Sequence, residues 1–230
     1  MSERTYKNRF RSIAKKLLYI LIGIHLFVIG AGFLFFAACI FFNPPASSIE
    51  LQRKYISGHK ILEKHFIEFD KIPEDLKKMV VLSEDGTFWD HWGFDFNAIS
   101  EAMEKNLKSG KVRVGGSTIS QQLVKTMLLF PGRSFTRKYF EAILTFEMEM
   151  ILSKKRILEL YLNYIEFGKG IFGIETASKV YFKKAPASLT KEEMASLITI
   201  IPSPVRFNPH NFTSSKRMSN RYNYLLKKSY

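Results

Sequence analysis

Residues 17–42 read LLYILIGIHLFVIGAGFLFFAACIFF, a run of 26 residues without a formally charged side chain. As an α-helix this run would be about 39 Å long at ~1.5 Å per residue, more than the ~30 Å hydrocarbon core of a bilayer. A buried core helix is the alternative, but its apolar stretch is usually only about 10–14 residues long. We therefore expect a transmembrane signal anchor at residues 17–42.

The residues before this run set its expected orientation. Residues 1–16 contain six Lys or Arg side chains against one acid, Glu3. Because basic flanks stay in the cytoplasm, residues 1–16 are predicted to be cytoplasmic and residues 43–230 to lie outside. The box FAAC at 36–39 resembles a lipoprotein cleavage site, but the apolar run continues past the cysteine, so we favour an uncleaved anchor.

The charge and the cysteine content limit what the outer part can do. Cys39 is the only cysteine and lies in the apolar run, so residues 43–230 have no intramolecular disulfide and no thiol nucleophile. The chain has a formal net charge of +14, which suggests an anionic partner. Phospholipid head groups, a lipid-linked pyrophosphate and nucleic acid all fit, and charge alone does not choose among them.

The outer part is predicted to be mainly α-helical. Residues 43–71 are expected to be a linker leading into a domain at 72–212, and residues 213–230 a basic tail that is solvated or faces the membrane. No convincing series of strands appears. Helices are expected to begin near Pro73 and to cover 98–107, 117–129, 135–152, 155–167, 174–181 and 189–201. Thr190 and Glu193 form a capping-box pattern at the start of the last of these helices.

The first stretch with catalytic character is SEDGTFWDHWG at residues 83–93. Two adjacent acids, Glu84 and Asp85, end an apolar helix face, and aromatic residues follow. A carboxylate against apolar walls gains proton affinity, which suits general acid–base catalysis. Solvated acids at an exposed helix end are an equally good interpretation of this stretch.

The second stretch is GGSTISQQLVK at residues 115–125. Two glycines lead to Ser117, the expected N-cap, so the helix start would offer free backbone N–H groups to an anion. One helix face combines hydrogen-bonding groups with a cation: Thr118, Gln121, Gln122 and Lys125. This composition favours a groove for a sugar and a phosphate over an ordinary solvent-exposed face.

The third stretch is RSFTRKYFE at residues 133–141. Arg137 and Lys138 precede Glu141 by four and three residues. They could form only a helix-surface ion pair, worth ~0.3–0.5 kcal/mol. Alternatively they hold a second carboxylate among cations that bind phosphate.

These stretches together resemble the glycosyltransferase domain of class A penicillin-binding proteins and of monofunctional biosynthetic peptidoglycan glycosyltransferases. The family reads Glu-Asp-x-x-Phe-x-x-His-x-Gly, which matches Glu84, Asp85, Phe88, His91 and Gly93. It also reads Gly-x-Ser-Thr-Ile-(Thr/Ser)-Gln-Gln-Leu-x-Lys at 115–125, and Arg-Lys-x-x-Glu at Arg137, Lys138 and Glu141. Two further blocks match at RILELYLN (156–163) and at 189–202, in the family order. One departure is Thr126, where the family usually has Asn.

The resemblance implies a lysozyme-like, two-lobed helical domain with a head and a membrane-contacting jaw. Residues 127–130 and Phe135 line that jaw or belong to the core. The implied reaction joins lipid II units into β-1,4-linked glycan strands, with inversion and release of undecaprenyl pyrophosphate. The chain is expected to carry this activity alone, as a single-pass protein of the bacterial inner membrane.

The resemblance also implies roles for individual residues. Glu84 would be the base, with Asp85 and His91 ordering the site. Lys125, Arg133 and Lys138 would stabilise the leaving pyrophosphate, and Glu141 would orient these groups or assist departure. The full set of expected substrate contacts is Asp85, His91, Ser117, Thr118, Gln121, Gln122, Lys125, Arg133, Arg137 and Lys138.

Cofactors and partners are less defined. The five histidines show no metal-ligand spacing, so no dedicated metal site is predicted, although a divalent cation (Mg²⁺ or Mn²⁺) near Glu141 stays open. Expected partners are lipid II, the growing glycan strand, the anionic membrane surface and cell-wall or division proteins, but not nucleic acid. The alternatives are a glycan-cleaving lysozyme-like hydrolase, which the cations near Glu141 disfavour, and a non-catalytic membrane scaffold, which the presence of both acids disfavours.

Overall fold

The computed structural model describes residues 3–110, 115–130, 132 and 134–228, and this part is mainly α-helical, as predicted. The α-helices are α1 (Glu3–Phe41), α2 (Ser48–Tyr55), α3 (Glu74–Glu84), α4 (Phe96–Ser109), α5 (Ile119–Leu128), α6 (Phe135–Ile151), α7 (Lys154–Tyr164), α8 (Ile174–Phe182), α9 (Lys191–Ile200) and α10 (Lys216–Lys228). The short elements are the 3-10 turns η1 (Phe69–Lys71), η2 (Pro186–Ser188) and η3 (Phe212–Ser214) and the strands β1 (Glu166–Gly168) and β2 (Ile171–Phe172).

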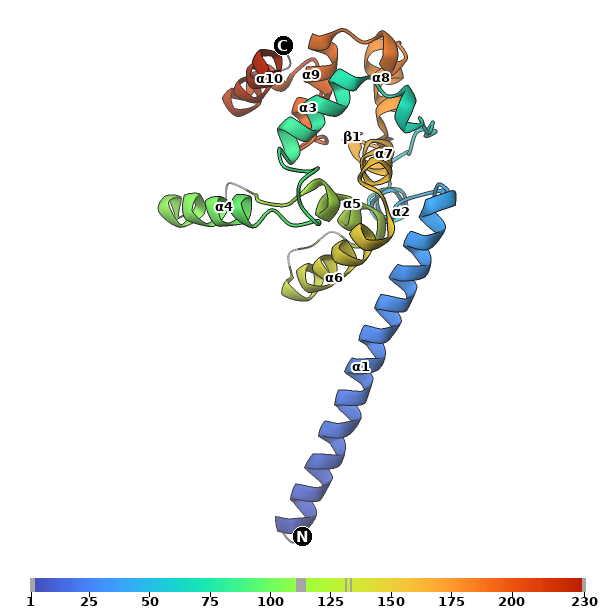
Figure 1. Ribbon diagram of the computed structural model, residues 1–230, viewed down its shortest axis with the longest axis vertical. Coiled ribbons are helices and arrows are strands. Elements are labelled where there is room, and N and C mark those ends of the chain that lie inside the picture. The colour runs from blue at the N-terminus through green and yellow to red at the C-terminus, as the bar shows by residue number, and fades with distance from the viewer. Residues whose placement is uncertain (1–2, 111–114, 131, 133, 229–230) are drawn as a thin grey trace.

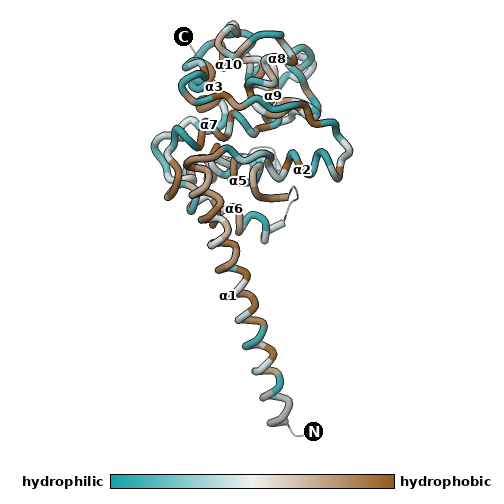
Figure 2. Tube along the Cα trace, turned by 90° about the vertical axis from the view of Figure 1, so that its right-hand side faces the viewer, coloured by the Kyte–Doolittle hydropathy of each residue, from teal (hydrophilic) through white to brown (hydrophobic). Residues whose placement is uncertain are grey.

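The predicted anchor is part of one long helix, α1, which projects from the rest of the chain (Figure 1). Hydrophobic residues cover most of α1, and hydrophilic ones gather toward its N-terminal end (Figure 2). The segment Arg9–Phe41, 33 residues long, is the one helix in the described part of the chain that is long and apolar enough to cross a membrane. The fold class, a helical domain preceded by one membrane-spanning helix, is therefore confirmed.

The end of α1 is fixed to the domain by side-chain hydrogen bonds. The Arg156 guanidinium of α7 donates to the backbone oxygens of Cys39 and Phe42, at 2.8 and 3.0 Å. The Tyr164 hydroxyl donates to the Pro44 carbonyl. A guanidinium satisfies carbonyls that the last turn of a helix leaves without partners. The anchor is therefore held against the domain where the sequence suggested a plain linker.

A short helix that the sequence did not reveal, α2, follows this junction. Ser47 accepts from the Glu50 amide at 3.2 Å, and the Glu50 carboxylate accepts from the Ser47 amide, which completes a capping box. Glu50 is buried and pairs with Lys64 at 3.0 Å. Eight residues are too few to display a clear hydrophobic period, so the pattern gave no helix here.

The helices form two lobes that α7 connects. α3, α8, α9 and α10 make the upper lobe in Figure 1, and α4, α5 and α6 make the lower lobe, from which α1 descends. α7 contacts α5 in one lobe and α8 in the other, and residues 157–164 of α7 are all buried. α1 packs along α6.

A small hairpin interrupts the predicted helix 155–167. α7 ends at Tyr164, and β1 pairs antiparallel with β2 through a turn in which Gly170 has a φ of +75°. A Cβ at Gly170 would also overlap the Lys60 carbonyl oxygen. The glycines in this segment therefore allow a turn that a helix could not make.

The predicted basic tail forms α10, which packs against α3 and α9. Met218 and Leu225 are buried at 4% and 0% exposure, and they recur at i and i+7, as on one helix face. The many basic residues of this segment hid its amphipathic spacing. The packed helix differs from the solvated tail that we expected, and it reaches the candidate site.

The residues expected at the jaw divide between core and surface. Met127 is 5% exposed and belongs to the core, whereas Phe130 and Phe135 are 66% and 97% exposed. Tyr139 of α6 hydrogen-bonds His25 of α1 at 3.2 Å. Tyr139, which is 52% exposed, therefore lies on the surface of the lower lobe that adjoins α1.

Candidate active site

The first stretch of the site begins where α3 ends. The helix buries Leu76, Met79 and Val80 against α9, and its last residue, Glu84, follows Val80 by four residues and so lies on the same side of the helix. Asp85 follows in an extended conformation with φ −164° and is 7% exposed. The backbone changes from helical at Glu84 to extended at Asp85, so these two adjacent acids have different surroundings.

Asp85 connects the first stretch to the second. Its Oδ2 accepts from the Ile119 amide, the first N–H of α5, at 2.9 Å, and its Oδ1 bonds His91 Nε2 at 2.9 Å. A carboxylate at a helix N-terminus is stabilised by the unpaired N–H groups and by the helix dipole. The anion that the sequence predicted at this helix start is therefore a side chain of the protein itself.

The hydrogen bonds of His91 assign its tautomer. The Gly93 amide donates to His91 Nδ1 at 3.0 Å. Because an amide N–H can only donate, Nδ1 is the acceptor and Nε2 carries the proton that is donated to Asp85. Gly93 has a φ of +82°, and a Cβ there would lie 2.8 Å from the Thr145 Cγ2 atom, so only glycine fits the turn. Asp85 and His91 are thus engaged with the protein and act as positioning residues.

The N-cap of α5 is Thr118, not Ser117 as we predicted. The Thr118 hydroxyl accepts from the Gln121 amide at 3.2 Å and donates to the Gly93 carbonyl at 2.7 Å, and Gln121 Oε1 accepts from the Thr118 amide at 3.1 Å. Thr118 and Gln121 are 2% and 3% exposed. The predicted polar face is therefore partly a closed capping box, while Ser117 stays exposed beside it.

Glu84 is held by two polar partners instead of apolar walls. Its Oε2 accepts from Gln122 Nε2 at 3.1 Å, and its Oε1 pairs with the Arg221 guanidinium of α10. Gln122 is itself fixed by the Tyr161 hydroxyl, which donates to its Oε1 at 3.0 Å. Burial and the nearby Glu84 carboxylate raise the pKa of Tyr161, so this hydroxyl stays a donor. Arg221 and Tyr161 are the residues that sequence reasoning did not assign to the site.

Glu141 is buried among cations on α6, as the third stretch suggested. It is 2% exposed, its Oε2 pairs with Arg137 Nη1 at 2.7 Å, and its Oε1 pairs with the Lys138 ammonium. Arg137 Nε also donates to the Gly132 carbonyl at 2.7 Å. Buried ion pairs of this kind fix geometry, and removal of one partner leaves an uncompensated charge.

Lys125 of α5 lies within electrostatic reach of both acids. Its side chain keeps contact with solvent, but enough protein surrounds it that desolvation lowers its pKa below the ordinary 10.5. Glu141 and, less strongly, Glu84 oppose this shift, whereas Arg137 and Lys138 add to it. Lys125, Arg137 and Lys138, which we call the cation cluster, therefore lie around Glu141, and Lys125 is also within electrostatic reach of Glu84.

Two adjoining cavities run beneath α4. The first, about 150 Å³, is lined by Glu84 and Ser83 together with the loop 115–118. The second, about 240 Å³, extends from the same loop to Lys138. Gly116 and Ser117 line both cavities, and a Cβ at Gly116 would lie 2.9 Å from the Ala98 carbonyl oxygen of α4. Glu84 thus lines one of two adjoining cavities, which we call the α4 cleft, and Lys138 of the cation cluster lines the other.

The residues around Glu141 do not form a ligand set for a divalent cation. Both carboxylate oxygens pair with cationic side chains, and Lys125 adds a further positive charge. Mg²⁺ and Mn²⁺ need several oxygen ligands. The described part of the chain contains no group of three His, Cys, Asp or Glu side chains that could hold a metal ion.

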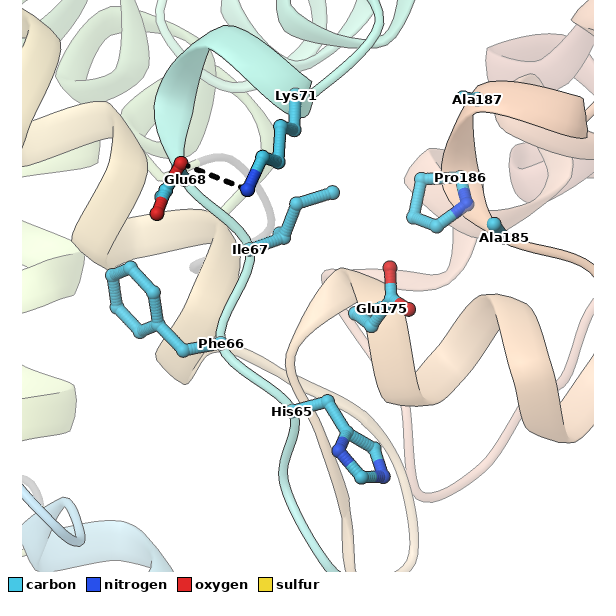
Figure 3. Close-up of a pocket in the computed structure, with 9 residues that line it drawn as sticks. All are labelled: His65, Phe66, Ile67, Glu68, Lys71, Glu175, Ala185, Pro186 and Ala187. Atoms are coloured by element: carbon cyan, nitrogen blue, oxygen red, sulfur yellow. Dashed lines mark ion pairs between the residues drawn. The ribbon is translucent and has the colours of Figure 1, made fainter.

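A separate cavity of about 410 Å³ lies in the upper lobe, between residues 65–71 and the segment of α8 and η2 (Figure 3). Glu68 and Lys71 form an ion pair of 3.0 Å on its wall. None of the residues predicted for the site lines it. Six of the predicted site residues line the two cavities beneath α4 instead: Glu84, Asp85, Ser117, Thr118, Gln121 and Lys138. Arg133 lies outside the described residues.

The fold and the site define an enzyme in which two carboxylates, Glu84 and Glu141, and a cation cluster lie beside two adjoining cavities, in a domain that follows a candidate membrane span. The sequence profile of the Transglycosylase family matches residues 52–230, and the chain belongs to that family. It is 43% identical to a biosynthetic peptidoglycan transglycosylase of Chromobacterium violaceum, over 73% of this chain and 75% of the relative. A protein of the same name from Shewanella frigidimarina is 43% identical over 75% of this chain and 74% of the relative. Another from Neisseria gonorrhoeae is 42% identical over 73% of this chain and 71% of the relative.

Proposed function

We propose that this enzyme polymerises lipid II into the glycan strands of peptidoglycan and releases undecaprenyl pyrophosphate. Family membership and the names of the similar biosynthetic peptidoglycan transglycosylases support peptidoglycan as the product. The observation that carries the choice of substrate is that Glu84 and Lys138, a member of the cation cluster, line two adjoining cavities. One cavity offers a base for a sugar hydroxyl, and the other offers positive charge for a pyrophosphate.

Glu84 is the base in this proposal. A sugar hydroxyl of the acceptor attacks the anomeric carbon of the donor, the bond from that carbon to the pyrophosphate oxygen breaks, and the hydroxyl proton passes to Glu84. Arg221 and Gln122 each use one carboxylate oxygen. A carboxylate has about four lone-pair sites, so both oxygens can still accept a further hydrogen bond from the cleft.

The cation cluster stabilises the leaving group. The pyrophosphate oxygen gains negative charge as its bond to the sugar breaks, so cations placed there bind the transition state more tightly than the ground state. Glu141 is buried and paired with Arg137 and Lys138. Its role here is to hold these two cations in position, and Lys125 is the cation that faces the Glu84 side.

Other residues of the predicted site hold the cleft in shape. The chain of contacts from His91 through Asp85 to α5, and the capping box of Thr118 and Gln121, fix the helix that carries Gln122 and Lys125. Ser117 is exposed and lines both cavities, so its side chain is placed to contact a sugar. Pre-organised groups of this kind lower the reorganisation needed at the transition state.

The location follows from the anchor. We propose a single pass through the bacterial inner membrane, with the basic residues 1–16 in the cytoplasm and the catalytic domain outside, where the substrate head group is displayed. The basic outer surface would also contact anionic lipids. We also propose cell-wall or division proteins as partners.

Incubating the purified full-length protein in vesicles with labelled lipid II tests the proposal. Formation of long glycan polymer, without release of soluble fragments from purified cell wall, supports it. Fragment release without any polymer would favour the lysozyme-like hydrolase and would reject the proposed reaction.

A further inference from the structure

The outer face of α10 is basic and lies next to the candidate base. The helix has five basic and no acidic side chains, while Met218 and Leu225 form its buried face. Arg221 pairs with Glu84 and donates to the Ser83 carbonyl at 3.2 Å. The last helix of the chain therefore brings positive charge to the edge of the candidate active site.

Two further side chains of α10 continue from Arg221 along the helix. Tyr224 and Lys228 follow Arg221 by three and seven residues, so the three lie on one face. Tyr224 is 47% exposed, and Lys228 is exposed ~10.5 Å farther along the helix axis than Arg221, at ~1.5 Å per residue. Helix side chains lean toward the N-terminus, so both lean back toward the level of Arg221. We call Tyr224 and Lys228 the outer stripe.

The position of α10 argues against the bilayer as the partner of the outer stripe. α10 belongs to the upper lobe, and Figure 1 shows it at the end of the molecule opposite to the N-terminal end of α1. Anionic head groups attract basic side chains only within about a Debye length, ~8–10 Å. An anionic ligand of the outer stripe is therefore expected to extend outward from the active site.

We infer that the outer stripe binds the growing glycan strand and keeps it on the enzyme between additions. The inference rests on the proposed function, because it takes the pyrophosphate of the donor to lie at the cation cluster. A growing strand that acts as the donor then has its reacting end between that cluster and Glu84. Its older sugars lead away from the membrane, from the lower lobe that carries the cluster toward the upper lobe that carries α10.

The chemistry of the outer stripe suits a glycan that carries peptides. The C–H face of a sugar ring presents positively polarised hydrogens, which the negative face of the Tyr224 ring attracts. The peptides on peptidoglycan strands end in carboxylates, with which the Lys228 ammonium can pair. Each contact is weak, so the strand can advance by one unit after each addition, but the two together slow its dissociation.

The length of the product tests this inference in the full-length protein, supplied with labelled lipid II in vesicles. The double variant Tyr224→Ala, Lys228→Glu should make strands about three- to tenfold shorter. Both positions are exposed, so the protein should fold normally. In the first coupling neither substrate carries a strand, so the rate of that step should stay within about twofold of wild type. Strands of wild-type length from the double variant would overturn the inference.

Single variants separate the two contacts from general effects of charge. Lys228→Glu should shorten the strands about two- to threefold, whereas Lys227→Glu should not, because Lys227 is exposed on the same helix but turned by ~100° around it. Tyr224→Phe keeps the ring and should preserve the strand length that Tyr224→Ala reduces. Equal shortening by Lys227→Glu and Lys228→Glu would contradict a specific contact.

A binding measurement distinguishes the strand from a lipid surface. Soluble peptide-bearing glycan strands should bind the full-length protein in uncharged nanodiscs, and the double variant about tenfold more weakly. If the double variant instead loses binding to vesicles of anionic phospholipid and binds strands as the wild type does, the outer stripe is a membrane contact and the inference fails. If the wild type makes no polymer, the proposed function fails. If the wild type polymerises and the double variant makes strands of full length, only the assignment of the outer stripe fails.

Discussion

Replacing Arg221 by Met should impair turnover although this residue comes from the last helix of the chain. Arg221 pairs with Glu84 Oε1 and also donates to the Ser83 carbonyl at 3.2 Å. The side chains of Arg221 and Glu84 are only 21% and 9% exposed. The substitution leaves the Glu84 carboxylate with the Gln122 hydrogen bond, so the base loses one of its two restraints.

The expected magnitude follows from this geometry. Loss of one partner from a largely buried charged pair should lower the free energy of unfolding by about 1–3 kcal/mol. A displacement of the base by ~1 Å should lower kcat by up to about 100-fold, while KM changes little because Arg221 contacts the base and not the cation cluster.

The assay is polymerisation of labelled lipid II by protein whose folding is checked by circular dichroism. Arg217→Met is the matched control, because Arg217 is exposed on the same helix and the charge change is identical. Arg221→Lys should recover part of kcat, since it restores charge without the two-pronged contact. A folded Arg221→Met protein with the turnover of Arg217→Met would refute the positioning role.

Three further perturbations test other parts of the structure. Lys125→Ala and Lys138→Ala should each lower polymerisation by ~10²–10³, measured as kcat on lipid II; full turnover in both would remove the cations from the leaving-group role. Gly32→Leu should weaken packing of α1 on α6 by about 1–3 kcal/mol, because a Cβ at Gly32 overlaps Leu144 and Glu147. Gly30→Leu is the control, because a Cβ at Gly30 meets no other atom. Equal melting temperatures of the two variants in detergent would contradict this contact. Burial raises the pKa of Glu147, so ionisation of this carboxyl group opposes folding above the unfolded pKa of ~4.3. Glu147→Gln should therefore raise the melting temperature at neutral pH and have little effect on it near pH 4. A change in melting temperature that does not depend on pH would argue against this cause.

Much of the fold could be predicted from the sequence because its elements have strong local patterns. The apolar run identified the anchor, and Thr190 with Glu193 form the predicted capping box at the start of α9. α2 and α10 were missed for different physical reasons. α2 is too short for a period, and the charge of α10 concealed the spacing of Met218 and Leu225.

The sequence predicted which residues belong to the candidate site more fully than it predicted the contacts between them. Sequence spacing put Thr118 and Gln121 on the same helix face as Lys125, but spacing cannot tell a buried capping box from an open groove. The pairing of Glu84 with Arg221 joins residues 137 positions apart and depends on tertiary packing. The i, i+7 spacing of Met218 and Leu225 was the one pattern that could have pointed to this helix.

The central claim is that Glu84 accepts the proton of the attacking hydroxyl. Glu84→Gln keeps the size of the side chain and its ability to hydrogen-bond, but it cannot accept a proton at neutral pH. The most direct measurement is the rate of glycan polymerisation from lipid II by the folded Glu84→Gln protein, with lipid II binding measured in parallel. Unchanged binding with a rate lowered by ~10²–10⁴ is the predicted result, and near wild-type polymerisation by that folded variant would contradict the claim.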